Sequence, residues 1–221
     1  MADKMELYHI HKHNNYDKLW KPYREITVSE NFKSIMSKRY NDFTTSMIIE
    51  EDQNKILLNF HDYLLTLLSS KTQINRQEFQ KILQIAYQTS YFSNMFKRET
   101  ALENYRKNNF NFLPSRLHSI YLTDEKGVSY WIDALDAKDY DLCRVEVTGN
   151  IFKTNEQLLP DETLSYKDAY ENSFNYWHPN FKKVPDNTNE YLVNGKIKIL
   201  EKIKKRLLNN YEQAIFSIFY S

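Results

Sequence analysis

A short stretch near the N-terminus alternates polar and apolar residues. Residues 6–11, Glu-Leu-Tyr-His-Ile-His, are rich in β-formers and change character at every second position, which predicts a β-strand. His9 and His11 then share one face of that strand, because successive side chains point to opposite faces. The pattern is weak between residues 14 and 45, where we expect a loop with one or two short helices, one of them beginning near Ser29 as its N-cap.

Two longer stretches repeat apolar residues every three or four positions. Residues 50–68 carry one such stripe, which predicts a helix formed around Ile56, Leu57, Phe60, Leu64, Leu67 and Leu68. Residues 75–108 hold neither Gly nor Pro and predict one long helix, or two with a bend near Thr89 and Ser90. Residues from about 50 to 108 thus form a helical insertion after the first strand.

After Pro114 the pattern favours strands again. We expect strands at residues 117–122, 142–152, 191–193 and 196–200. The last two are joined by Asn194 and Gly195, a strong hairpin signal, and Gly149 indicates a bulge or turn. Helices are predicted at 128–137, after a turn at 124–127, and at 201–219.

These elements predict an α+β fold in a single domain spanning residues 1–221. The chain shows no internal repeat or flexible linker, and 221 residues are enough for one sizeable core. Hydrophobic residues make up 41% and charged residues 27%, as in ordinary globular domains. The formal net charge of +1 provides no global field to attract nucleic acid, which leaves only a local basic patch open.

Cellular location is indicated by two features of the sequence. Cys143 is the only cysteine, so no internal disulfide forms, and its apolar neighbours favour a buried hydrophobe over a nucleophile. The N-terminus has no apolar run of signal-peptide length, and no stretch approaches the length of a membrane span. We expect a cytoplasmic protein that does not contact membranes.

The common catalytic motifs are absent from the sequence. It has no Gly-rich phosphate loop, no nucleophile elbow, no paired cysteines and no helical pair of histidines at metal-binding spacing, so no metal site is expected. Three glycines also make a Rossmann unit a poor prediction.

Four segments, taken in order, carry a resemblance to a known superfamily. They are Leu7-Tyr8-His9-Ile10, residues 114–123 (Pro-Ser-Arg-Leu-His-Ser-Ile-Tyr-Leu-Thr), residues 144–152 and Asn189-Glu190-Tyr191-Leu192-Val193. Together they resemble the His-Tyr-Glu branch of the ADP-ribosyltransferase superfamily, and a poorly characterised bacterial family within it. The resemblance covers the first strand and residues 98 to about 203. It implies an ADP-ribosyltransferase-like split β-sandwich with the helical insertion at about 50–108 and a C-terminal helix.

The resemblance also implies a catalytic triad. His9 hydrogen-bonds the nicotinamide ribose, Tyr121 stacks on the nicotinamide ring, and Glu190 acts at the reacting ribose. A carboxylate there stabilises the positive charge that develops as the nicotinamide bond breaks. His11 is a rival for the first position and Glu146 for the third. The implied NAD-binding residues are Tyr8, Ile10, Arg116, Ser119 and Tyr130.

The sequence departs from the family pattern in the loop after the first strand. Related bacterial enzymes usually have a glycine where this chain has Trp20-Lys21-Pro22-Tyr23. A separate polar set, Arg98, Glu99, Glu103 and Arg106, fits ordinary helical ion pairs, or with Arg116 a pyrophosphate site.

The implied function is mono-ADP-ribosyl transfer from NAD, as substrate, to a macromolecular acceptor, a protein or a nucleic acid. Such families often act as bacterial toxins or phage-defence effectors, for which an antitoxin or inhibitor would be a partner. Two alternatives stay open: a non-catalytic protein-interaction module on the same fold, and an enzyme that hydrolyses NAD outright or handles RNA 2'-phosphate.

Overall fold

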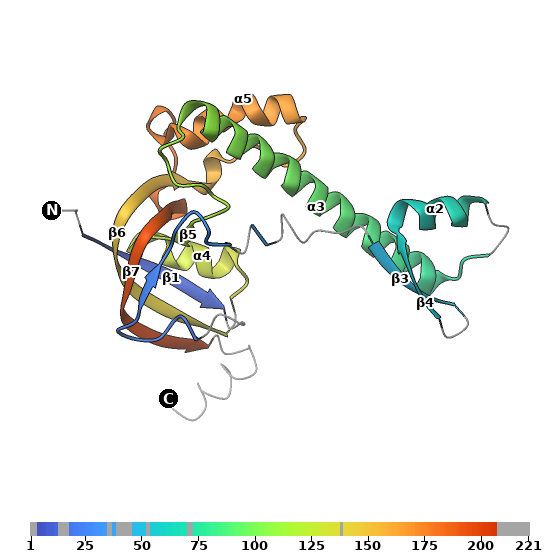
Figure 1. The fold of residues 1–221 in the computed structure, drawn as a ribbon, viewed down its shortest axis with the longest axis horizontal. Helices are drawn as coiled ribbons and strands as arrows, with labels where there is room; N and C mark the ends of the chain where they lie inside the picture. The colour runs from blue at the N-terminus through green and yellow to red at the C-terminus, as the bar shows by residue number, and fades with distance from the viewer. Residues whose placement is uncertain are drawn as a thin grey trace, which may run out of the picture.

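The computed structural model describes residues 4–12, 18–34, 37–38, 46–51, 54–69, 73–137 and 139–206. It confirms the α+β fold class: a curved antiparallel sheet of five strands is packed against helices (Figure 1). The specific split β-sandwich and the single-domain boundary stay predictions.

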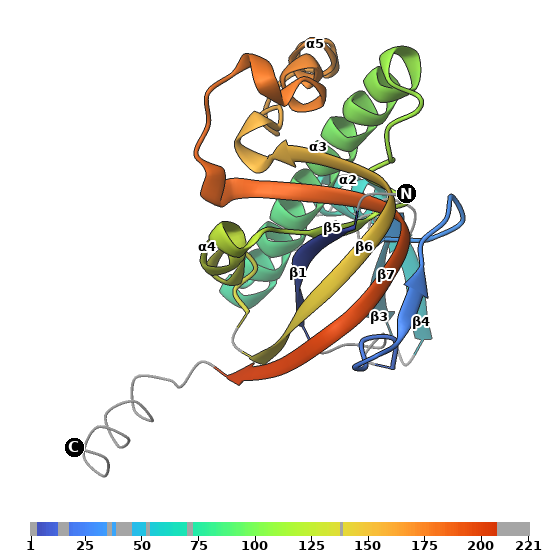
Figure 2. The same ribbon diagram turned by 90° about the vertical axis from the view of Figure 1, so that its left-hand side faces the viewer.

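Two long strands form the centre of the sheet. β6 (Asp139–Asn155) and β7 (Asn189–Arg206) pair antiparallel along their whole length, and Figure 2 shows them curving side by side. β1 (Met5–Lys12) pairs with β6, while β2 (Glu25–Thr27) and β5 (Ile120–Leu122) pair with β7. A bridge between Tyr8 and Thr123 also brings β5 next to β1.

The inner face of the curved sheet holds the main hydrophobic core. Odd-numbered residues of β1 and β6 point to this face, where Leu7 lies opposite Val145. Trp20, Ile26 and Val28 close the core from the segment after β1. The buried residues of this cluster are Leu7, Trp20, Ile26, Val28, Ile120, Leu122, Cys143, Val145, Val147, Tyr191, Val193, Ile197 and Ile199.

Helices cover the opposite, outer face. The 34-residue α3 (Arg76–Asn109) packs beside α5 (Tyr166–Trp177), and both lie over the start of β7, where Leu102, Tyr176 and Leu192 belong to one cluster. α4 (Val128–Ala134) covers β1 through the cluster around Ile10. Short 3-10 helices occupy Glu125–Gly127, Glu156–Leu158, Pro179–Phe181 and Asp186–Thr188.

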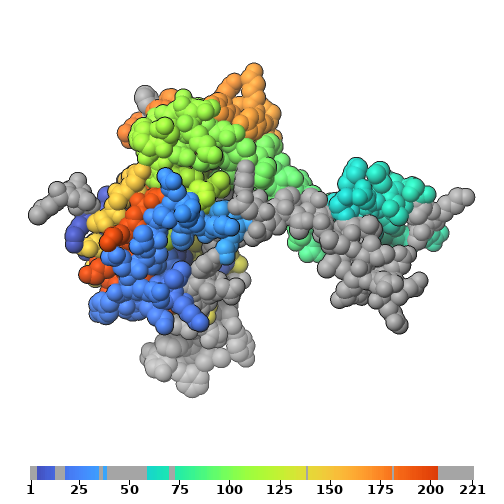
Figure 3. Space-filling view, viewed as in Figure 1, coloured from blue at the N-terminus to red at the C-terminus, as the bar shows by residue number. Residues whose placement is uncertain are grey.

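A second, smaller unit lies at the other end of α3. It consists of a two-stranded sheet, β3 (Ser46–Glu51) and β4 (Asn54–Asn59), followed by α2 (Phe60–Ser69). Figure 1 places these elements at the N-terminal end of α3, away from the main sheet, and Figure 3 shows α2 in the same place. α3 begins with a capping box, in which Asn75 accepts from Glu78 N while the Glu78 side chain accepts from Asn75 N.

The helix predictions are confirmed in part. The stretch 75–108 is a single helix with no break at Thr89, and the helix expected at 128–137 is α4. The helix expected over 50–68 is wrong in its first half, because Asn54–Asn59 is a strand that pairs with Ser46–Glu51, and the helix is Phe60–Ser69. No helix begins at Ser29, where the chain makes a turn through the bond from Phe32 N to Ser29 O.

The largest correction concerns β7. The hairpin expected at Asn194 and Gly195 is one uninterrupted strand, and the predicted helix from residue 201 is strand up to Arg206; residues 207–219 of that prediction lie outside the described part. Gly195 pairs with Gly149, and both have positive φ, 155° and 128°. The two glycines let the backbones meet closely within the ladder, so Gly195 marks close approach rather than a turn. The bulge expected at Gly149 lies instead between Arg144 and Val145.

Candidate functional site

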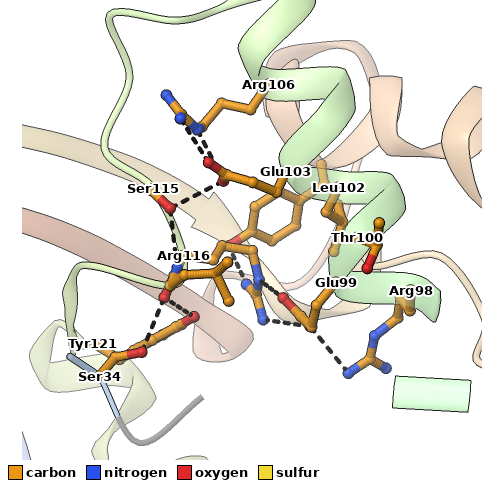
Figure 4. A network of polar contacts seen from close by, with 12 residues as sticks. Ser34, Arg98, Glu99, Thr100, Leu102, Glu103, Arg106, Ser115, Arg116 and Tyr121 are labelled. Atoms are coloured by element: carbon orange, nitrogen blue, oxygen red, sulfur yellow. Dashed lines mark hydrogen bonds and ion pairs between the residues drawn. The ribbon is translucent and has the colours of Figure 1, made fainter. Parts of the chain in front are cut away.

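Arg116 lies at the centre of a buried polar network on the outer face. It stands just before β5 and is only 4% exposed. Its Nε donates to Glu99 Oε2 of α3 at 2.8 Å, and its Nη1 donates to Glu190 Oε1 of β7 at 2.7 Å. In Figure 4, the Arg116 guanidinium contacts Glu99, and the backbone carbonyl oxygen of Arg116 accepts a hydrogen bond from the Tyr121 hydroxyl. One guanidinium therefore joins a helix, a loop and a strand that are distant in sequence.

Glu190 begins the long strand and is almost fully buried. The Tyr176 hydroxyl, which comes from α5, donates to the same Oε1 atom that Arg116 contacts. Burial raises the pKa of Tyr176 well above its usual value, so this hydroxyl keeps its proton. Burial alone would lower the pKa of Arg116, but Glu99 and the other neighbouring groups raise it well above normal. Glu190 is therefore a carboxylate already paired with a permanent cation.

A second ion pair extends the network along α3. Arg106 Nη2 donates to Glu103 Oε1 at 2.7 Å, and Ser115 Oγ donates to Glu103 Oε2 at 3.0 Å (Figure 4). At the outer end, Arg98 Nη1 donates to Glu162 at 2.7 Å. Within this set, Glu103 and Arg106 form an i,i+3 pair along the helix. The shortest ion pairs of Arg98 and Glu99 are with Glu162 and Arg116, outside α3.

Tyr121 and Tyr130 form the more accessible side of the same region, since both are partly exposed. The Tyr121 hydroxyl donates to Arg116 O at 2.8 Å, and the Arg116 Cζ lies 5.3 Å from the Tyr121 ring centroid. The Tyr130 hydroxyl donates a hydrogen bond to the Glu156 carboxylate. Burial, with Glu156 and Glu190 nearby, raises the pKa of Tyr130 to about 12. Contacts thus join Tyr121, Arg116 and Glu190, whereas Tyr130 is hydrogen-bonded to Glu156.

The His9 ring does not lie beside Tyr121, Arg116 and Glu190. It pairs with Cys143 on the inner face and stacks on Trp20, with ring centroids 3.8 Å apart and planes at 11°. Its Nδ1 lies 3.1 Å from the backbone carbonyl oxygen of Tyr121. Side chains of Tyr121 and His9 therefore point to opposite faces of the sheet, and the three predicted catalytic groups do not meet in one place.

The protonation of His9 follows from this setting. Burial lowers its pKa to about 3, and His11 adds to the decrease, while the bond to the Tyr121 carbonyl opposes it. A carbonyl oxygen only accepts, so Nδ1 carries the proton and Nε2 is the acceptor nitrogen. His9 is a neutral imidazole near neutral pH.

The remaining predicted residues have different surroundings. The position of Tyr8 in β1 places its side chain on the outer face, on the same side as Tyr121. Ile10 packs with Ala137 and Tyr140 in an apolar cluster, which is a packing role. Ser119 is fully buried, and within the described part of the chain its hydroxyl has no hydrogen-bond partner.

The rival residues lie elsewhere. His11 is buried on the inner face, opposite Asp141, whose carboxylate binds Lys202 at 2.6 Å. Glu146 pairs with Lys4 at 3.0 Å at the surface. Cys143 is buried, as expected, and burial raises the pKa of its thiol to about 12, so it remains a protonated packing residue.

Sequence reasoning missed α5 and therefore the role of Tyr176. The signal was present, because Ser165 accepts from Asp168 N and Ser-x-x-Asp is a helix-start pattern. The stacking of His9 on Trp20, which belongs to the main core, was also not predicted.

Among the described residues, no group of three or more His, Cys, Asp or Glu side chains is placed to hold a metal ion. In the same part of the chain, no helix is both long and apolar enough to cross a membrane.

Comparison with known families assigns most of the sequence to one group. Residues 7–205 match DUF2441, described as a protein of unknown function. The chain belongs to the DUF2441 family. The DUF2441 match runs from β1 nearly to the end of β7, so it contains the whole Arg116 network and also the α3 segment. A search of curated proteins finds no match to this DUF2441 member.

Proposed function

We propose that this protein is an NAD-consuming transferase of the ADP-ribosyltransferase type, with its site on the outer face around Tyr121 and Glu190. The observation that carries the proposal is that Arg116 and Tyr121, from residues 114–123, meet Glu190, from the start of β7, in one region of the sheet. These residues come from the segments whose order resembles the superfamily. The proposal includes the split β-sandwich fold and a macromolecular acceptor.

The chemistry of the region supports a cationic substrate. Tyr121 and Tyr130 offer aromatic faces on which a flat, positively charged nicotinamide ring can stack. Glu190 supplies the carboxylate for the developing ribosyl cation. Its pairing with Arg116 and Tyr176 holds its position but also neutralises it, so the reaction needs a change in these contacts when NAD binds.

His9 has a supporting part in this proposal. Its imidazole holds the Tyr121 carbonyl from the inner face, which fixes the backbone beneath the Tyr121 ring. Tyr8, on the outer face, is the residue of β1 that shares a side with Tyr121. The proposed site therefore uses Tyr8 where the family pattern would use His9.

One observation favours the second candidate, a non-catalytic interaction module on the same fold. Glu190 is nearly fully buried, and its Oε1 already receives two donors, Arg116 Nη1 and the Tyr176 hydroxyl. A carboxylate in such a setting stabilises the fold without any catalytic role.

The test is release of nicotinamide from NAD by the purified chain, alone and with total cellular protein, RNA or DNA as acceptor. Wild type is compared with Glu190→Gln, which keeps the shape of the side chain and removes its charge. The matched control is Glu162→Gln, which alters a carboxylate at the outer end of the same network, paired with Arg98 at 2.7 Å.

We expect release by wild type and Glu162→Gln and at least a hundredfold lower release by Glu190→Gln, within the roughly 10²–10³ range for losing one electrostatic stabiliser. Release without any acceptor would assign the chain to the NAD-hydrolysing alternative. Absence of release under every condition, with both variants folded, would reject the enzyme in favour of the interaction module.

A further inference from the structure

The first half of α3 exposes a row of large apolar side chains. Phe79, Leu83, Tyr87 and Tyr91 are 52%, 52%, 72% and 40% exposed. Their spacing of four places them along one ridge of the helix, which we call the α3 ridge. Figure 1 shows this half of α3 extending away from the main sheet, so the sheet and α5 do not cover it.

Three of the four ridge residues, Leu83, Tyr87 and Tyr91, lie in a part of the helix that has no charge. Residues 82–96 contain no Asp, Glu, Lys, Arg or His. A solvent-facing helix surface normally carries charged residues, whereas the centre of a protein interface is depleted of charge and enriched in aromatic side chains. Both properties of an interface centre thus coincide on an exposed face of α3.

We propose that the α3 ridge binds the α3 ridge of a second copy of this chain, in an antiparallel pair related by a two-fold axis. Ridges of the i±4 type on two helices interdigitate at a crossing angle of about −50°. An axis between Leu83 and Tyr87 sets Leu83 against the partner's Tyr87 and Phe79 against the partner's Tyr91. The surface is therefore self-complementary, as a two-fold contact requires.

The charges that flank the uncharged stretch are consistent with this pairing. With the axis at that position, Lys81 falls opposite the partner's Thr89, and Lys97 falls beyond the start of the partner's α3 at Arg76. Like charges do not oppose each other across the axis. A strongly charged partner would find no complementary charge on the ridge, which favours a second copy over an acidic or basic protein.

The exposed area sets the expected strength. Each ridge side chain exposes on the order of 100 Å², so the four from each copy bury roughly 800 Å² in total, below the standard range of about 1,200–2,000 Å². The dimer should therefore be weak and depend on concentration.

Sedimentation velocity of the full-length chain over about three orders of magnitude in concentration tests the proposal. Leu83→Glu and Tyr87→Glu each insert a charge into the ridge. Gln88→Glu is the control, because it adds the same charge at an exposed position about 100° around the helix from Tyr87. Circular dichroism checks that α3 remains helical in each variant.

We expect the average mass of wild type and Gln88→Glu to rise toward the dimer with concentration, and both ridge variants to remain monomeric. A wild type that stays monomeric throughout would overturn the proposal. So would a wild-type dimer that both Leu83→Glu and Tyr87→Glu preserve, since the contact would then lie elsewhere. The result does not depend on NAD turnover.

Discussion

Arg116 and Glu190 form a buried ion pair, with Nη1 2.7 Å from Oε1 and side chains that are 5% and 4% exposed. The pair joins the loop before β5 to the first residues of β7. Because Arg116 also binds Glu99, it is the shared partner of two buried carboxylates. The stability of the outer face and the state of the proposed catalytic carboxylate therefore depend on the same side chain.

Replacing Arg116 by Met should lower the free energy of unfolding by about 3–5 kcal/mol, because Glu190 would be left as a buried charge without its cation, and Glu99 would keep only the longer contact to Arg98 at 3.4 Å. Urea unfolding followed by circular dichroism measures the change. The control is the double variant Arg116→Met/Glu190→Gln, in which the unpaired charge of Glu190 is also removed. It should be more stable than Arg116→Met alone. A cost of the single variant below about 1 kcal/mol would mean that the pair contributes little.

The neutral state of His9 predicts a loss of stability in acid. Its pKa is lowered from 6.5 to about 3, so between these values the unfolded chain binds a proton that the folded chain does not. This contribution to stability is complete above pH 6.5 and falls as the pH decreases toward 3, with a slope of up to about 1.4 kcal/mol per pH unit. In His9→Gln, which cannot titrate, the dependence of unfolding free energy on pH should be flatter over that interval. Parallel curves for wild type and His9→Gln would contradict the prediction.

The Gly149 and Gly195 pair should resist substitution. In Gly195 a Cβ atom would lie 2.2 Å from Thr148 O, and the φ of 155° is one that other residues rarely adopt. We expect Gly195→Ala to cost about 3 kcal/mol or more, through backbone strain and displacement of β6. Thermal unfolding measures the cost, and Asn194→Ala, the preceding residue of the same strand, is the comparison. Equal melting temperatures for the two variants would show that the strands separate easily at this point.

Much of the secondary structure was predictable where local pattern and tertiary environment agree. β1 is a run of β-formers in which Leu7 and His11 are buried on the inner face, and α3 has no Gly or Pro that would interrupt it. The pattern failed at residues 50–59, since apolar spacing of three and four in a short run fits either a helix or a strand. It failed again at residues 194–206, where Asn-Gly and a run of lysines are locally typical of a turn and a helix, but pairing with the whole of β6 extends the strand.

The candidate site was predicted in its residues more than in its geometry. Tyr121, Arg116 and Glu190 are joined by contacts on the outer face. His9 lies on the inner face, because it is one residue away from Tyr8 in the strand alternation. Period-two alternation states that Tyr8 and His9 point in opposite directions, yet it does not tell which of them faces the helices. That choice depends on which side of the sheet α3, α4 and α5 cover.

The sequence by itself determined the fold class, the long helix over residues 75–108, the burial of Cys143 and the set of residues that carries the resemblance. Each of these follows from local composition and periodicity, which act over a few turns of chain. Only the tertiary structure decided which carboxylates share Arg116, which face His9 occupies and that β7 runs without interruption. Those outcomes depend on contacts between segments far apart in sequence. The free energy of these long-range contacts exceeds the local secondary-structure propensities of the residues involved.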